Sequence, residues 1–190
     1  MREADALSSV YDYLTSQLVG PVNFDDLLRF KLAYSVSAFD KLLHDIIREG
    51  MVETYTGRRP ATPKYLNEPV SLANMRALAA AVTPPPEIVF EGIVRMKLKI
   101  LSFQEPDKVS DGLSYVWDHS NKWDRISALL GAPTHDVRTR LKLIAGRRNS
   151  IVHEADLDPL THTKLPITKA EVDSTHIFLL NVGNAICSLV

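Results

Sequence analysis

The sequence contains a single cysteine, Cys187, among 190 residues. One cysteine cannot form an internal disulfide, and the Cys and His residues are not spaced as in structural zinc sites. The first five residues, MREAD, are acidic where a secretory signal would be basic and then apolar, and no run of about 18 apolar residues exists to span a bilayer. We therefore expect a protein of the reducing cytoplasm that does not contact a membrane.

Neither sign of charge is in excess, because 22 Lys and Arg residues stand against 23 Asp and Glu residues. The chain thus lacks the overall basic charge of a protein that coats nucleic acid, so any contact with RNA or DNA must come from a local patch. Hydrophobic residues make up 45% of the chain, which is enough for a packed core and excludes a largely disordered protein. The length suits one domain over residues 1–190.

Alternation of apolar and polar residues, typical of half-buried strands, is not sustained anywhere, whereas apolar residues recur at helical spacing along almost the whole chain. The sequence therefore predicts an all-α fold. We expect an N-terminal helix over residues 1–20, ended by Gly20-Pro21, and a long second helix that Asn23 caps and that reaches Tyr55. A basic, proline-rich loop follows at 57–70.

Further helices are predicted on both sides of the triple proline at 84–86. A short helix capped by Ser71 precedes it, and a helix with the stripe Val89, Ile93, Met96, Ile100 and Phe103 follows it, ending near Gln104. One interrupted helix or two short ones carry Trp117 and Trp123 within 109–130. A helix capped by Thr134 then runs to about Asp156. The last one opens on a capping box at 168–171 and runs through Val172, Ile177, Leu180, Val182 and Ile186.

The helix after Thr134 carries the residues best suited to chemistry. One of its faces has a row of residues at spacings of three or four, namely Val137, Leu141, Ile144, Arg148, Ile151 and Ala155. An arginine in an apolar row is costly unless it reaches solvent, pairs with an acid, or lines a cleft or an interface. Gly146, Asn149, His153 and Asp156 form a neighbouring ridge, so Arg148, Asn149 and His153 border one surface. Arg and His five residues apart are usually ordinary surface residues, and the position of Arg148 in the apolar row is what favours a site.

The phrase RRNSIVHEAD at 147–156 resembles the signature of the HEPN superfamily, an arginine followed by a polar residue and, after four to six residues, a histidine. The resemblance is to the RiboL-PSP-like branch, in which a Trp-containing helix precedes the motif, as KWDRI does at 122–126, and Pro-Ile opens the last helix, as at 166–167. The phrase SAFDKLLHD at 37–45 is similar to one on the long early helix of that branch. The resemblance spans roughly residues 24–190, and its specific part is the ten-residue phrase.

This resemblance implies an up-and-down helical bundle that dimerises, with the motif helices of two subunits facing each other across a cleft. Many HEPN proteins are metal-independent endoribonucleases of toxin-antitoxin or phage-defence systems. In that role His153 would act as acid or base, Arg148 would stabilise the phosphate, and Asn149 would orient one of the two. Arg147 also satisfies the spacing. The expected products are 2′,3′-cyclic phosphate and 5′-hydroxyl ends, and the expected partners are RNA, a second copy and an antitoxin protein.

Two other interpretations remain open. Some HEPN proteins have lost catalysis, so the alternative is a silent module that binds RNA, a nucleotide or a protein; the neutral charge of the chain mildly favours it. The third is a plain helical scaffold in which His153 has no role. The intact set of Arg148, Asn149 and His153 favours the ribonuclease.

Weaker candidates lie elsewhere. Asp40 and His44 stand four residues apart on the long helix, and we expect this pair to support the motif helix by a hydrogen bond. The loop residues that could follow an RNA backbone and stack on a base are Arg58, Arg59, Lys64 and Tyr65, although a solvated loop fits them equally well. Glu154 and Asp156 lie close enough along the chain to tune His153, but we expect them to be solvated charges at the helix end. Glu-x-x-His pairs and Gly-rich phosphate loops are missing, so we expect no metal and no cofactor.

Overall fold

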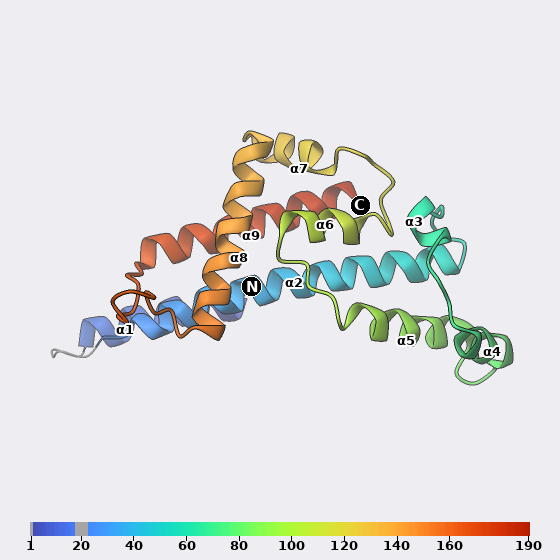
Figure 1. Cartoon of the computed structure of the whole chain (residues 1–190), viewed down its shortest axis with the longest axis horizontal. Helices are drawn as coiled ribbons and strands as arrows, with labels where there is room; N and C mark the ends of the chain where they lie inside the picture. Colours follow the sequence, from blue (N-terminus) through green and yellow to red (C-terminus); the bar gives the residue numbers. More distant parts are fainter. Residues whose placement is uncertain (1, 18–22) are drawn as a thin grey trace.

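The computed structural model describes residues 2–17 and 23–190, which form helices joined by loops (Figure 1). In chain order the helices are α1 (Arg2–Gln17), α2 (Asp25–Tyr55), α3 (Pro63–Leu66), α4 (Leu72–Ala80), α5 (Pro86–Leu98), α6 (Pro106–Leu113), α7 (Lys122–Leu130), α8 (Thr134–His153) and α9 (Lys169–Leu189). The described residues contain no strand, only an isolated bridge between Leu157 and Lys164. The predicted all-α fold is confirmed. None of the described helices is long and apolar enough to cross a membrane.

Helix α2 is the spine of the molecule. Its 31 residues make it roughly 46 Å long. Its buried apolar side chains recur at spacings of three or four, in the order Leu28, Leu32, Val36, Phe39, Leu43 and Ile47. Helices α1, α5, α6, α8 and α9 all pack against it, and α8 crosses it steeply in front (Figure 1). The buried residues from α2 to α9 form one continuous core.

Several helix starts agree with the sequence. Ser71 accepts a hydrogen bond from the N–H of Asn74 at 3.1 Å, and Thr168 forms the predicted capping box with Glu171. Asn23 does not occupy the cap position of α2, which Phe24 holds, although its Oδ1 accepts from the N–H of Asp25 at 2.6 Å. Leu18 and Gly20-Pro21, the expected end of the first helix, lie outside the described residues.

The limits of α8 differ from the prediction at both ends. Thr134 is its first residue rather than its cap, because Pro133 takes the cap position and the Thr134 hydroxyl donates to Asp124 at 2.7 Å. The helix stops at His153 and not near Asp156. Ala155 and Asp156 have φ angles of 53° and 59°, a left-handed conformation in which a helix cannot continue.

The side chains predicted to be buried on α5 differ from those that are buried, mostly by one position along the chain. The buried side chains are those of Phe90, Val94 and Leu98, and the helix ends at Leu98. Ile100, which the spacing predicts to be part of the stripe, is 86% exposed. The ring of Phe90 stacks on that of Tyr55 with 4.3 Å between their centroids. This contact turns the side of α5 that carries Phe90 towards the core, in place of the predicted side that carries Val89.

Smaller corrections concern the connections and α9. The 57–70 segment is not wholly irregular, because α3 lies within it with Thr62 as its cap. Trp117 lies between α6 and α7, while Trp123 belongs to α7. On α9, Ile177 and Leu180 are exposed.

His176 of α9 is buried, although the stripe predicted for the last helix does not include it. Its Nδ1 lies 3.0 Å from the Ser35 hydroxyl of α2, and its Nε2 lies 3.3 Å from the Asp5 carboxylate of α1. Burial lowers the pKa of His176. The ring therefore joins three helices on the side where α1 packs.

Two glycines allow a matched test of this packing. A Cβ added to Gly112 of α6 would lie 2.4 Å from the Phe103 ring and 2.8 Å from Ile47, whereas one added to Gly92 of α5 would contact nothing within 4 Å. We expect Gly112→Ala to lower the free energy of unfolding by about 1–3 kcal/mol, because the core must shift. Gly92→Ala should raise it by about 0.5–1 kcal/mol, because alanine favours a helix. Urea denaturation followed by circular dichroism measures both, and equal effects would contradict the close packing at Gly112.

Candidate functional site

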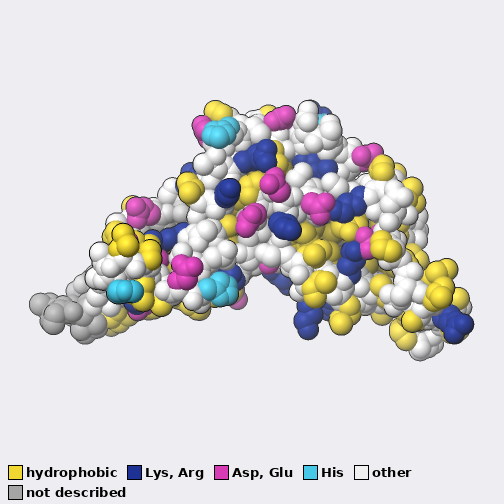
Figure 2. Space-filling view, viewed as in Figure 1, with side chains coloured by type: hydrophobic (Ala, Val, Ile, Leu, Met, Phe, Trp, Pro, Cys, Tyr) yellow, Lys and Arg dark blue, Asp and Glu magenta, His cyan; other side chains and the backbone are white. Residues whose placement is uncertain are grey.

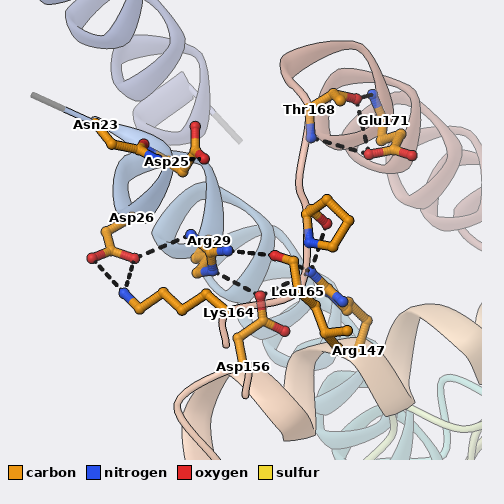
Figure 3. A network of polar contacts seen from close by, with 11 residues as sticks. Asn23, Asp25, Asp26, Arg29, Arg147, Asp156, Lys164, Leu165, Thr168 and Glu171 are labelled. Atoms are coloured by element: carbon orange, nitrogen blue, oxygen red, sulfur yellow. Dashed lines mark hydrogen bonds and ion pairs between the residues drawn. The ribbon is translucent and has the colours of Figure 1, made fainter. Parts of the chain in front are cut away.

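A fully buried carboxylate holds the C-terminal end of α8. Asp156 is 0% exposed, and its Oδ2 accepts hydrogen bonds from Arg29 Nε at 2.7 Å and from Arg147 Nη2 at 2.8 Å (Figure 3). Arg29 also donates to the carbonyl of Leu165 at 2.6 Å, and Arg147 to that of Pro166 at 3.0 Å. This network, which we call the Asp156 clamp, joins α2, the end of α8 and the segment that leads to α9.

The expectation that Asp156 is a solvated charge is therefore wrong. Because α8 ends at His153 and the chain then turns through the left-handed region, the Asp156 side chain points inward to the two arginines. Glu154 is exposed. Arg147, which also fits the spacing expected of the phosphate-binding arginine, is instead engaged in the clamp.

Asp26 of α2 closes the outer side of the clamp. Lys164 Nζ donates to its carboxylate at 2.6 Å, and Arg29 Nη1 does so at 3.2 Å. The hydrogen bond from Lys164, together with the nearby Arg29, holds the pKa of Asp26 below its usual value. The long segment after α8 is thus tied to α2 both at the surface and in the interior.

A pocket of about 540 Å³ lies between α8, the connector at 99–105 that joins α5 to α6, and α6 itself. Its lining residues are Ile100, Leu101, Ser102, Phe103, Gln104, Glu105, Lys108, Asp111, Ala145, Arg148 and Asn149. Arg148 Nη1 donates to Asn149 Oδ1 at 3.2 Å. Arg148 Nε is buried and has no hydrogen-bond partner among the described residues. The arginine of the apolar row therefore lines a cleft with one of its donors unused.

Asp40 and His44 of α2 contact the connector, which forms the wall of this pocket that faces α8. The N–H of Phe103 donates to Asp40 Oδ1 at 2.5 Å, and the ring of His44 lies 4.7 Å from that of Phe103. His44 Nε2 is 3.7 Å from Asp40 Oδ2. The sequence predicted that this pair would support the motif helix, whereas its contacts in the structure are with the connector.

His153 lies apart from the pocket. It is the last residue of α8, its side chain is exposed, and it forms no hydrogen bond or ion pair with the described parts of the chain. Arg148 and Asn149 are thus brought together in one pocket, while His153 stands one turn of the helix beyond Asn149.

The loop residues proposed for RNA contact are mostly occupied. Arg59 donates to the carbonyl of Val116 at 3.0 Å, and Lys64 donates to the main-chain carbonyl of Asp111 at 3.0 Å. Tyr65 is half-buried, and burial raises the pKa of its hydroxyl. Arg58 is exposed. Lys64 reaches the edge of the Arg148 pocket through Asp111, and the other three do not line it.

Charge on the face that carries α8 is mixed. Figure 2 shows Lys and Arg side chains interspersed with Asp and Glu over this face, without a continuous basic patch. Among residues 2–17 and 23–190, no three or more His, Cys, Asp or Glu side chains gather as ligands for a metal ion.

Comparison with known families identifies the family of the chain. A family model described as RiboL-PSP-HEPN matches residues 2–190. The chain belongs to the RiboL-PSP-HEPN family. The resemblance noted in the sequence is confirmed and extends through α1. No curated protein and no solved structure matches the chain. In this HEPN domain the signature phrase covers the last turns of α8 and the turn that carries Asp156.

The Asp156 clamp can be tested by removing its carboxylate. Asp156→Ala leaves Arg29, which is 7% exposed, as a buried charge without its main partner. We expect the free energy of unfolding to fall by about 3–5 kcal/mol. Asp118, exposed in the loop before α7, provides the control, and Asp118→Ala should change stability by less than about 0.5 kcal/mol. Urea denaturation compares the two, and losses of similar size would show that Asp156 does not hold the clamp.

Proposed function

We propose that this HEPN protein is an endoribonuclease in which a ribose 2′-hydroxyl attacks the neighbouring phosphate. The products are a 2′,3′-cyclic phosphate and a 5′-hydroxyl. The proposal rests chiefly on one observation: Arg148 lines an open pocket together with Asn149, close along the same helix to an exposed His153. Membership of the family fits a ribonuclease or an RNA-binding module, and these side chains favour the ribonuclease.

Each of the three residues suits a step of this reaction. An imidazole can remove the 2′-hydroxyl proton or return one to the leaving 5′-oxygen. The guanidinium of Arg148 can neutralise the charge that develops on the phosphoryl oxygens, a task that needs no metal ion. Asn149 accepts a hydrogen bond from Arg148 and so fixes the direction of its guanidinium.

The proposed active form is a homodimer. Two proton transfers call for two groups, and two copies with their α8 helices facing each other supply two His153 side chains. One outward side of α8 suits such a contact: Leu143 is 68% exposed, and a Cβ at Gly146, which lies on the same ridge as His153, would meet nothing within 4 Å, so a second backbone can approach closely. In the cell we propose the role of a toxin or a phage-defence component, held in check by an antitoxin protein.

The decisive assay is RNA cleavage in excess EDTA. The parent protein should cleave RNA and leave 2′,3′-cyclic phosphate ends. His153→Asn cannot transfer protons and should lower the rate by about 10²–10⁴-fold without unfolding the protein, because the side chain is exposed. His162→Asn is the control, since His162 is also exposed and asparagine tolerates its φ of 54°. If the folded parent protein cleaves no RNA, the proposal fails and the RNA-binding module is favoured.

Substitutions of the two neighbouring arginines should have different effects, one chiefly on activity and the other chiefly on stability. Arg148→Ala is expected to reduce cleavage at least about a hundredfold while changing the free energy of unfolding by less than about 1 kcal/mol. Arg147→Ala removes a partner of the buried Asp156 and should cost about 1–3 kcal/mol of stability. Thermal unfolding measures the stability of both variants, and the RNA cleavage assay in EDTA measures their activity. The opposite pattern would assign the phosphate to Arg147.

A further inference from the structure

The wall of the pocket opposite Arg148 combines apolar and polar side chains. Its apolar lining residues are Ile100, Leu101 and Phe103 of the connector, and Ala145 of α8 adds a methyl group on the side of Arg148. Polar side chains lie beside them, among them Gln104 and Lys108. Apolar surface next to side chains that can form hydrogen bonds suits a flat heterocycle, and RNA-binding proteins read unstacked bases in this way.

The connector that forms this wall is held in place before any ligand binds. Its Phe103 N–H is bonded to Asp40 and its Phe103 ring packs on His44, both on the long helix α2. Arg148 and Asn149 on the other wall belong to α8, whose end the Asp156 clamp fixes. Because both walls are supported, a ligand pays little to order the pocket.

Gln104 is the group on this wall best suited to read a base. Its side chain is half-buried in the pocket and forms no hydrogen bond with the described residues. A primary amide offers two donors and an acceptor, the set needed to tell one base edge from another. Asn149 has the same chemistry, but its oxygen already accepts from Arg148.

The charges around the pocket separate the base from the backbone. Glu105 of the connector and Lys108 and Asp111 of α6 line the side opposite α8, and Asp111 is paired there with Lys64, so the charges on that side largely cancel. Arg148 on α8 would therefore attract the phosphate, so the backbone belongs at α8 and the uncharged base towards the connector.

We infer that this pocket is a nucleobase subsite that holds the base next to the phosphate bound by Arg148, and that Gln104 selects that base. The inference rests on the proposed ribonuclease and adds the determinant of its sequence preference. It also gives Asp40 and His44 a role, because they position the connector that carries Gln104.

Binding of single nucleotides tests the subsite without cleavage. Isothermal titration calorimetry of the full chain with adenosine, guanosine, cytidine and uridine 3′-monophosphates should show affinities that differ by about fivefold or more between the best and the worst ligand. Gln104→Ala should reduce that ratio to less than about twofold, and Gln104→Glu, which keeps the shape but loses the donors, should change which base is preferred. Arg148→Ala should weaken all four equally and leave the ratio unchanged, as expected of a phosphate contact. Gln17→Ala, at an exposed position on α1, is the control and should match the parent protein.

The outcomes separate the subsite from the ribonuclease. Equal affinities in the parent protein, or a preference that persists in both Gln104 variants, overturn the inference. A nucleotide preference that depends on Gln104, without cleavage of any RNA, supports the subsite and contradicts the ribonuclease. RNA cleavage without such a preference overturns the subsite alone.

Discussion

The buried carboxylate of Asp156 is the contact on which the site most depends. An unpaired charge at 0% exposure would be too costly to keep, and here two guanidinium groups share its Oδ2, while Oδ1 has no partner among the described residues. To reach them, the chain must leave the helical conformation at Ala155. The clamp therefore ends α8 at His153, so that the histidine stands exposed at a helix terminus and is not packed in the middle of a helix.

Helix α2 sets the distance between the two supports of the site. Arg29 and Asp40 both belong to it, eleven residues or roughly 16 Å apart along its axis. Arg29 fixes the end of α8 through Asp156, and Asp40 fixes the connector through the Phe103 N–H. One rigid element thus positions both walls of the pocket. Functional groups that rest on a buried helix in this way keep their geometry better than groups on free loops.

The features that the sequence predicts correctly are local ones. Helical periodicity identifies the all-α class and the length of α2, and the caps at Ser71 and Thr168 need only neighbouring residues. The failures need tertiary information. Asp156 looks like a surface charge until Arg29, 127 residues away, is placed beside it, and the aromatic stack that selects the buried face of α5 joins two helices. Gln104 gives no signal, because the sequence predicts only that a helix ends near it and not that the connector folds over α8.

Helix geometry explains why Arg147 and Arg148 have different surroundings. Adjacent residues point about 100° apart around a helix axis, so two neighbouring arginines cannot face the same side, and one turns to the clamp while the other turns to the pocket. The same arithmetic separates Arg148 from His153 by about 140°, and a single straight helix cannot direct both into one pocket. If both act on one phosphate, the RNA must lie across the surface of α8, or a second copy must supply the histidine, and the exposure of His153 suits the second copy.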